Sequence, residues 1–409
     1  MTEVGVIPED WEVKELSSIS AIKSGKRLPK GSLVTSSKTP YPYIRVIDMN
    51  MGYLNLSNIM YVPENVQPMI SKYIISKNDI YISVAGTLGL VGKIPEELDG
   101  ANLTENANRI TEIQCNRDYL MYYMMSPLIQ NVIEAERTIG AQPKLALQRI
   151  RDFYIVLPRD KREQTAIATA LSDVDSLIST LTKKIEKKKA IKQGLMQQLL
   201  TGKKRLPGFC GDWMTYSIEE LFELGNGYTP SKAITSFWFN GTIPWFRMED
   251  IRLHGRILKD SIQHITLKAV KGGRLFPKDS IILSTTATIG EHAWLNVDSL
   301  ANQQFTFLMR KRSCCDTISV KYFFYYCYIL GDWCRANINE GGLMAVNMED
   351  LRKYNFAIPP TISEQTAIAN ILSDCDSEIA ALKEKRDKYK EIKQGMMQQL
   401  LTGKIRLIK

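Results

Sequence analysis

The chain has 409 residues, with 53 Lys and Arg, 44 Asp and Glu, and a formal net charge of +9. This length predicts two or three domains, each large enough to bury its own core. The composition, 44% hydrophobic and 24% charged residues, is typical of a globular protein and argues against a disordered or fibrous chain.

Secretory, membrane and zinc-binding proteins are also disfavoured. Residues 1–10 have neither the basic nor the apolar region of a secretory signal. The longest apolar stretch, residues 322–330, is far shorter than a membrane span. The seven Cys include no CxxC pair, and none pairs with a His at zinc spacing. We therefore expect a cytoplasmic protein with reduced thiols, no metal site and no membrane segment.

Residues 1–160 are predicted to form a mixed α/β domain. Segments rich in β-forming residues lie at 43–46 and 80–84, and Gly-containing turns separate them. A helix is predicted from Tyr119 to Ile133, where it would supply much of the core. A last strand, Phe153–Leu157, leads into a long helix.

That long helix is predicted within residues 161–206. Its apolar residues alternate in steps of four and three, which is the seam of a coiled coil. The seam consists of Ile167, Leu171, Val174, Ile178, Leu181 and Ile185, and after a charged segment of Ile191, Leu195 and Leu199. The helix closes on Thr201-Gly202, where Gly suits a left-handed cap.

Residues 207–361 are predicted to form a second α/β domain, and residues 362–409 a second long helix. The predicted elements of this domain are strands at Ile281–Ser284, Phe305–Leu308 and Tyr354–Ile358, and a core helix at Val320–Asn337. The second helix has a seam at Ile368, Leu372, Cys375, Ile379 and Leu382, then at Ile392, Met396 and Leu400. Helices of about 40 residues are ~60 Å long, and we expect the two to cover their narrow apolar faces by packing antiparallel.

The chain contains an internal repeat. Glu163–Ala168 recurs as Glu364–Ala369, and Met196–Lys203 recurs as Met397–Lys404, both at an offset of 201 residues. Weaker matches extend into the α/β domains, for example Arg45 with Arg247 at an offset of 202. The chain is therefore two tandem copies of one unit, a divergent part followed by a nearly identical part. Such copies suggest two modules that dock alike but recognise different things.

Gly194 and Gly395 interrupt the two long helices at equivalent positions, at a cost of about 1 kcal/mol each relative to Ala. Two explanations are open: the two helices approach each other closely at these residues, or a partner subunit docks there.

No catalytic machinery is recognisable. No GxGxxG follows a strand, and Gly202-Lys203 and Gly403-Lys404 lack the rest of a P-loop. The chain also lacks the Asn-Pro-Pro-aromatic segment of amino-methyltransferases, and three His are too few for acid–base triads without special arrangement. Nothing in the sequence supports catalysis by this chain.

The repeated helix end, Ile191–Lys203 and Ile392–Lys404, with a variable domain before each copy, resembles the specificity subunit of type I restriction–modification systems. The resemblance covers the whole chain. It implies an α+β fold in which two α/β target-recognition domains are separated by two long helices, packed as an antiparallel coiled coil with an internal pseudo-two-fold repeat. The implied domain limits are 1–160, 161–206, 207–361 and 362–409.

The resemblance also implies a function and partners. Each target-recognition domain would read one half of a bipartite double-stranded DNA target, and the helices would set the spacing. Two methyltransferase (modification) subunits and restriction/translocase subunits would bind this non-catalytic chain. No cofactor is expected on this chain, since S-adenosylmethionine, ATP and Mg would belong to the partners.

Candidate DNA-binding residues have the side chains that favour base and phosphate contacts. In the first domain they are Lys23, Lys26, Arg27, Lys30, Arg45, Thr87, Gln142 and Lys144. In the second they are Tyr228, Thr229, Ser231, Lys232, Arg247, Thr285, Thr286, Thr288, Asn302, Gln303 and Gln304. Asn302–Gln304 resembles a family motif, from which Glu105-Asn106-Ala107 in the first domain departs. For Arg45 and Arg247 the alternative is a structural arginine paired with Asp48 and Asp250, respectively.

The excess positive charge is concentrated in one segment. Residues 161–206 hold 11 Lys and Arg against 4 Asp and Glu, whereas residues 1–160 hold 17 against 18 and residues 207–361 hold 16 against 15. The predicted DNA-reading domains are therefore close to neutral. Two alternatives remain, a standalone DNA methyltransferase or nuclease and a coiled-coil scaffold that binds no nucleic acid.

Overall fold

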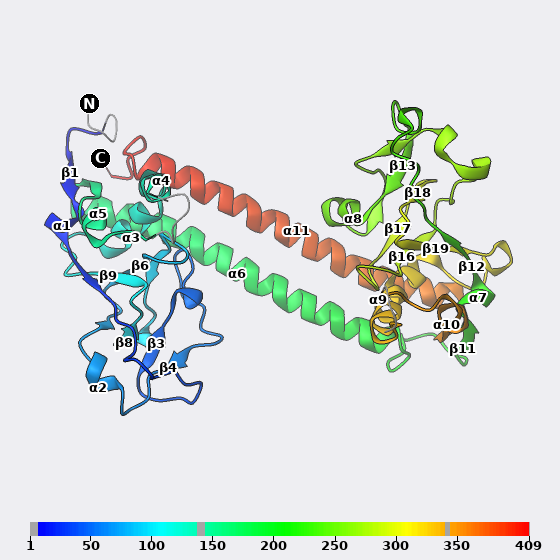
Figure 1. Cartoon of the computed structure of the whole chain (residues 1–409), viewed down its shortest axis with the longest axis horizontal. Coiled ribbons are helices and arrows are strands. Elements are labelled where there is room, and N and C mark those ends of the chain that lie inside the picture. Colours follow the sequence, from blue (N-terminus) through cyan, green and yellow to red (C-terminus); the bar gives the residue numbers. More distant parts are fainter. Residues whose placement is uncertain (1–6, 137–143, 340–343, 409) are drawn as a thin grey trace. The chain divides into compact units, whose positions relative to one another are not determined.

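The computed structural model describes residues 7–136, 144–339 and 344–408 (Figure 1). No helix in these three ranges is long and apolar enough to span a membrane.

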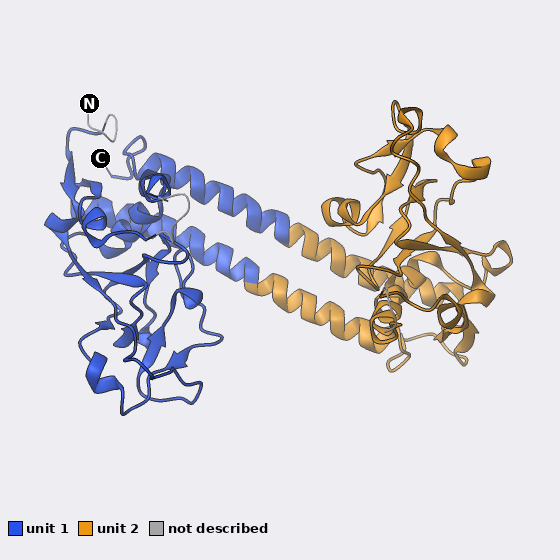
Figure 2. Cartoon of the chain, viewed as in Figure 1, with its two compact units in different colours: residues 1–182, 383–409 blue, residues 183–382 orange. Residues whose placement is uncertain are grey.

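The chain forms two compact units (Figure 2). Unit 1 comprises residues 1–182 and 383–409, and unit 2 comprises residues 183–382. Each unit combines one α/β module with one segment of each long helix, α6 (Lys161–Leu199) and α11 (Ile362–Leu400). The predicted domain limits are not tested by this division and stay predictions.

The first module, in unit 1, is a mixed α/β structure. Its strands are β1 (Trp11–Glu15), β2 (Ala21–Ser24), β3 (Pro42–Ile44), β4 (Met60–Tyr61), β5 (Ile74–Ile75), β6 (Ile80–Ser83), β7 (Val91–Lys93), β8 (Ala101–Leu103), β9 (Ala107–Thr111) and β10 (Tyr154–Pro158). Its helices are α1 (Leu16–Ile19), α2 (Gln67–Ile70), α3 (Arg117–Met125), α4 (Pro127–Ala135) and α5 (Leu147–Arg151). The strands pair in the orders β2-β9-β6-β7, β4-β3-β8-β5 and β1-β10, and only β3 and β8 pair in parallel among these described strands.

The second module, in unit 2, repeats this arrangement. Its strands are β11 (Met214–Ser217), β12 (Phe222–Asn226), β13 (Ile243–Phe246), β14 (Ile257–Leu258), β15 (His264–Ile265), β16 (Ile281–Ser284), β17 (His292–Leu295), β18 (Leu300–Ala301), β19 (Phe305–Arg310) and β20 (Asn355–Ile358). Its helices are α7 (Ile218–Leu221), α8 (Met248–His254), α9 (Val320–Ala336) and α10 (Met348–Lys353). The orders are β12-β19-β16-β17-β14, β15-β13-β18 and β11-β20, and β13 pairs with β18 in parallel, as β3 does with β8.

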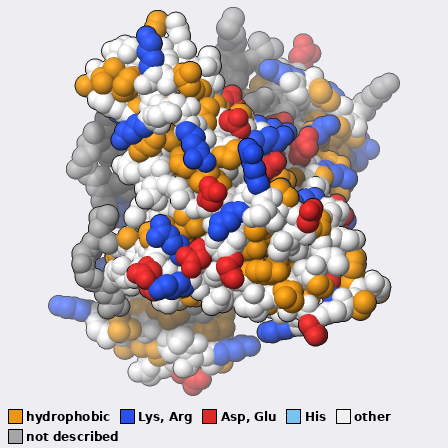
Figure 3. Space-filling view, turned by 90° about the vertical axis from the view of Figure 1, so that its right-hand side faces the viewer, with side chains coloured by type: hydrophobic (Ala, Val, Ile, Leu, Met, Phe, Trp, Pro, Cys, Tyr) orange, Lys and Arg blue, Asp and Glu red, His pale blue; other side chains and the backbone are white. Residues whose placement is uncertain are grey.

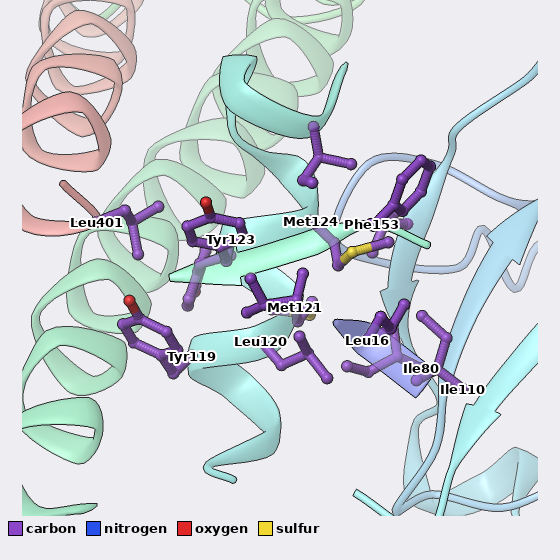
Figure 4. Close-up of a cluster of buried hydrophobic side chains, with 14 of the residues drawn as sticks. Leu16, Ile80, Ile110, Tyr119, Leu120, Met121, Tyr123, Met124, Phe153 and Leu401 are labelled. Carbon is purple, nitrogen blue, oxygen red and sulfur yellow. The ribbon is translucent and has the colours of Figure 1, made fainter. Parts of the chain in front are cut away.

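The core of each module contains a helix whose central residues are buried on all sides. In α3, residues 119–124 are all buried, because side chains cover the helix on opposite faces. Ile80 and Ile110 of the sheet belong to this cluster on one face, and Leu401, which follows α11, belongs to it on another (Figure 4). Helix α9 has the same role in unit 2.

Most predicted elements are found with ends shifted by one or two residues. The helix predicted from Tyr119 to Ile133 is wrong as a single element, since it is divided into α3 and α4 at Ser126. Pro127 disfavours helical backbone at the residue before it, and Ser126 is extended. The strand predicted at 43–46 stops at Ile44, because Asp48 accepts a hydrogen bond from the Arg45 backbone and closes a tight turn.

The segments of α6 and α11 pack antiparallel within each unit (Figure 1). In unit 2, Lys188 pairs with Glu378 at 2.7 Å and Lys192 with Asp376 at 2.6 Å. Residue numbers therefore increase along α6 in the direction in which they decrease along α11. In unit 1, Lys393 and Asp175 form the equivalent pair at 2.7 Å. The fold class predicted from the sequence is confirmed.

A tyrosine from each core helix joins these pairs. Tyr122 of α3 donates to Asp175 at 2.8 Å, and Tyr325 of α9 donates to Asp376 at 3.0 Å. Each aspartate is therefore shared between a module and both long helices, which fastens the module to the helix pair.

The predicted seam is only partly correct. Leu171, Ile185 and Leu372 are buried, but Ile191 is 43% exposed and Ile392 is 40% exposed, so the predicted continuation of the seam through these two residues is wrong. The next residues, Lys192 and Lys393, face the other helix instead, because their ammonium groups pair with aspartates there.

Close helix approach does not explain the helical glycines. A Cβ atom added at Gly194 or at Gly395 would meet nothing within 4 Å. Of the two explanations from the sequence, close packing between the long helices is therefore wrong.

Candidate nucleic-acid interface

Four loops in each module follow neighbouring strands. In the first module they are residues 25–30, 45–48, 84–89 and 104–106, which follow β2, β3, β6 and β8. In the second module they are residues 227–232, 247–250, 285–290 and 302–304, which follow β12, β13, β16 and β18. We call each set the loop cluster of its module.

The two loop clusters share one pattern of backbone hydrogen bonds, which we call the frame. In the first module the four bonds run from Gly25 N to Ala107 O (3.0 Å), Lys26 N to Leu103 O (2.8 Å), Thr104 N to Ile44 O (3.1 Å) and Val84 N to Asn106 O (2.7 Å). In the second module their counterparts, in the same order, run from Gly227 N to Phe305 O (2.9 Å), Tyr228 N to Ala301 O (2.8 Å), Asn302 N to Phe246 O (3.0 Å) and Thr285 N to Gln304 O (3.0 Å). These bonds hold the loops together and make their positions directly comparable between modules.

The frame corrects one register. It aligns Thr104-Glu105-Asn106 with Asn302-Gln303-Gln304, an offset of 198. Setting Glu105-Asn106-Ala107 against this motif, as in the sequence comparison, is therefore wrong by one residue. None of the three residues is identical to its counterpart, so identity between the two copies does not fix this register.

Gly25 and Gly227 are required by close backbone contact. A Cβ atom at Gly25 would lie 2.0 Å from the carbonyl oxygen of Thr104, and one at Gly227 would lie 2.3 Å from that of Asn302. Only glycine fits such an approach. The next carbonyl is held as well, since Tyr43 donates to Lys26 O and Trp245 donates to Tyr228 O, each at 3.0 Å.

The side chains carried by this common frame differ. In the first module the Arg27 Nε donates to Glu105 at 2.6 Å. This hydrogen bond raises the pKa of Arg27. Burial raises the pKa of the Glu105 carboxyl, but the hydrogen bonds from Arg27 and Thr104 and that of its own backbone outweigh it, so the net shift is downward. In the second module the same two positions are neutral, and the Thr229 hydroxyl donates to Gln303 Oε1 at 2.5 Å.

Arg45 and Arg247 each use part of their side chain in contacts within their own module. Arg45 donates through Nη2 to Asp48 at 2.8 Å and also to the Asn58 carbonyl, which is the structural alternative considered from the sequence. Arg247 pairs instead with Glu249 at 2.9 Å, while Asp250 accepts from its backbone nitrogen.

The remaining candidates of the first module are divided between the loop cluster and its surroundings. Lys26 and Lys30 are exposed on the first loop, and Lys26 lies 5.6 Å from the centre of the Tyr73 ring. Thr87 is exposed on the loop after β6. On the same loop, Ala85 forms an isolated antiparallel β-bridge with Lys144. Lys23 lies outside the cluster on β2, where it pairs with Glu112 at 2.5 Å. Gln142 lies outside the described residues.

In the second module the loop cluster contains all the candidate residues. Ser231 and Lys232 are exposed, whereas Tyr228 is half-buried and accepts from the Lys271 backbone at 2.6 Å. Thr285 is buried, with its hydroxyl 3.1 Å from that of Thr306. Thr286 forms an isolated antiparallel β-bridge with Ala345. The remaining polar contacts link Asn302 to Gln304 at 3.2 Å and Gln304 to Thr288 at 3.5 Å.

One face of the molecule carries charges of both signs. On the face drawn in Figure 3, Lys and Arg side chains are interspersed with Asp and Glu side chains. No group of His, Cys, Asp or Glu that could hold a metal ion occurs among the residues that the structure describes.

Two modules with one frame and different side chains define a tandem recognition protein. The family model described as the type I restriction modification DNA specificity domain matches residues 8–193 and again residues 211–394. The chain belongs to this family of type I restriction–modification specificity subunits.

Similar proteins agree with this assignment, and a solved structure has the same fold. The chain is 46% identical to the EcoprrI specificity subunit of Escherichia coli, over 42% of this chain and 43% of that protein. It is 27% identical to the MjaX specificity subunit of Methanocaldococcus jannaschii, over 99% of this chain and 96% of that protein. The S subunit of a type I system from M. genitalium has the same fold, with a TM-score of 0.58 at 16% identity over 98% of both chains.

Proposed function

We propose that this specificity subunit reads a bipartite double-stranded DNA target, with one half-site for each module. The observation that carries the proposal is the shared frame, which presents Arg27 and Glu105 in one module and Thr229 and Gln303 in the other. Equivalent backbones with different hydrogen-bonding groups suit two surfaces that bind the same polymer but different base sequences. The candidate residues of the two loop clusters supply the contacts.

The long helices set the spacing between the two half-sites. Helices α6 and α11 each have 39 residues and contribute a segment to both units. Because a helix adds 1.5 Å per residue, inserting equal helical segments in both should lengthen the gap in the DNA target. The catalytic activities belong to other subunits, and S-adenosylmethionine, ATP and Mg are used there.

The experiment is sequencing of DNA methylation in cells that express this chain with a modification subunit. The expected motif has two parts separated by a fixed gap, and it disappears when this chain is deleted. Exchange of residues 1–160 for those of a relative should change one half of the motif only. A continuous motif, or methyl transfer by the purified chain without any added subunit, would overturn the proposal.

We also propose that a matching surface on each long helix docks one modification subunit. Residues three and four apart form this docking face, which consists of Lys184, Lys187, Ile191, Gly194 and Gln198 on α6, and Lys385, Lys388, Ile392, Gly395 and Gln399 on α11. Both isoleucines are exposed and both glycines have open space beside them. The occupant that fits is a partner helix with an apolar stripe beside acidic side chains, approaching closely at the glycine.

Replacing Gly194 with leucine is expected to remove one of two bound modification subunits, while the chain itself becomes more stable by about 0.5–1 kcal/mol because leucine favours helix. Gly395→Leu should remove the other subunit, and the double variant should bind none. Native mass spectrometry measures the stoichiometry, and thermal unfolding measures the stability.

The matched control is Lys189→Leu, which adds the same side chain on another face of α6, where Lys189 is exposed. This variant should keep both subunits. Retention of two subunits by the Gly194→Leu, Gly395→Leu double variant would contradict the docking face.

A further inference from the structure

We propose that the paired positions 27 and 105 in the first module, and 229 and 303 in the second, read one base pair in each half-site. Arg27, held by Glu105, reads guanine, and Gln303, held by Thr229, reads adenine. The inference rests on the proposed function and adds the chemical identity of one base in each half of the target.

The geometry of Arg27 suits guanine. Its side chain is 78% exposed, yet its Nε is fixed by the hydrogen bond to Glu105 at 2.6 Å. Its two terminal nitrogens form no hydrogen bond with any residue that the structure describes. A guanidinium held in this way presents its fork outward, and a fork of two donors matches the O6 and N7 acceptors of guanine.

Glu105 is a positioning residue for this contact. One carboxylate oxygen accepts from Arg27 and the other accepts from the Thr104 hydroxyl at 3.0 Å. Its side chain is 28% exposed, so it is partly enclosed by the frame. The carboxylate therefore restrains the arginine before DNA binds, which reduces the conformational entropy lost in the contact.

The second module places a carboxamide where the first has a carboxylate. Gln303 is exposed, and its Oε1 accepts from the Thr229 hydroxyl at 2.5 Å. This bond orients the carboxamide and leaves its amide group free to donate. Since Oε1 retains a second acceptor direction, Gln303 can accept from N6 and donate to N7 of adenine, the pairing that distinguishes adenine from the other bases.

The other arginine and lysines of the first loop cluster fit this role less well. Arg45 donates from Nε and Nη2 to Asp48 and from Nη2 to Asn58, so its fork is occupied. Lys26 lies against the Tyr73 ring. Lys30 is exposed on the same loop as Arg27, and as a single point charge it suits a phosphate.

The test exchanges the pairs between modules in the complex with modification subunits, and reads methylated sites by sequencing. In the double variant Arg27→Thr, Glu105→Gln, one position of one half-site should change from guanine to adenine. In Thr229→Arg, Gln303→Glu, one position of the other half-site should change from adenine to guanine. Each change in preference should be about 5- to 150-fold, the usual discrimination of a bidentate base contact.

Two single substitutions keep the inference decidable if a double variant yields no active complex. Arg27→Lys retains the charge but loses the fork, so the guanine preference should fall about 10-fold or more at that position alone. Glu105→Gln should weaken the same preference while Arg27 is still present, as expected of a positioning residue. Lys30→Thr, the control on the same loop, should lower affinity for all sequences alike.

The outcomes separate the two proposals. A wild-type complex that produces no bipartite motif would refute the proposed function. A bipartite motif that is unchanged in Arg27→Lys and in the active double variants would refute this inference only. A change confined to the half-site of the other module would also refute it.

Discussion

Replacing Arg406 with methionine is expected to lower the free energy of unfolding of unit 1 by about 3 to 5 kcal/mol. The Glu163 carboxylate at the start of α6 is 1% exposed. It accepts from Arg406 at 2.5 and 2.7 Å and from the Trp11 indole at 3.2 Å. Without the guanidinium the buried Glu163 carboxylate loses its counterion. Because this carboxylate is almost inaccessible to solvent, hydration does not compensate for the lost ion pair. Chemical denaturation, with hydrogen exchange to assign each transition to a unit, measures the change.

The repeat provides matched comparisons. Arg205 pairs with Glu364, which is also 1% exposed, so Arg205→Met should destabilise unit 2 for the same reason. The exposed pair of Arg162 and Asp160 is the control, and Arg162→Met should leave the stability nearly unchanged because solvent screens the pair. The double variant Arg406→Met, Glu163→Gln should recover part of the loss, because no buried charge remains. A loss below 1 kcal/mol in Arg406→Met would show that water reaches Glu163.

Replacing Gly25 with alanine is expected to abolish discrimination at the half-site of the first module, and Gly227→Ala at that of the second. The added Cβ atom would lie 2.0 or 2.3 Å from a backbone oxygen of the neighbouring loop. Backbone atoms must therefore move, and the loop that carries Glu105 or Gln303 moves with them. Under the proposed function these loops contact more than one base pair, and each mismatched pair costs about 1 to 3 kcal/mol. The preference for the correct half-site should thus fall more than about 100-fold.

Competition binding by the complex measures this loss, with DNA in which one half-site is scrambled. For Gly25→Ala, scrambling the first half-site should no longer weaken binding, whereas scrambling the second still should. Gly100→Ala and Gly255→Ala are matched controls, since a Cβ atom at either position meets nothing within 4 Å. Both should retain discrimination despite their left-handed backbone. If Gly25→Ala still discriminates at both half-sites, the frame is not needed for recognition.

The architecture could be predicted from the sequence because its signals are local or repeated. Helices α6 and α11 follow from the apolar seam, and β10 and β20 follow from short β-rich segments that lead into a long helix. The exposed positions of Ile191 and Ile392 could not be predicted, because periodicity, the only local signal here, places both residues in the seam. Lys192 and Lys393 displace them by pairing with aspartates about 180 to 220 residues away in sequence, and such pairs carry no local signal.

The loop clusters were predicted as regions rather than as contacts. Residue type identifies Arg27, Thr229 and Gln303 as candidates, but it does not identify the residue that Arg27 contacts. Glu105 is not among the candidates, because the segment Glu105-Asn106-Ala107 departs from the motif with which the sequence aligns it. The chain between β3 and β8 differs in length from that between β13 and β18, and this changes the offset between the copies. Gly25 and Gly227 share the 202-residue offset of Arg45 and Arg247, and this signal could have identified the frame.

The division of the chain has a consequence for its biosynthesis. Unit 2 is one continuous stretch, residues 183–382, whereas unit 1 also needs residues 383–409. Leu400 and Leu401 enter the core of unit 1 beside Ile167 and Leu171. On the ribosome, unit 2 is therefore complete before the last pieces of unit 1 emerge. The module translated second can finish folding first, and the module translated first must keep part of its apolar surface uncovered until synthesis has passed α11.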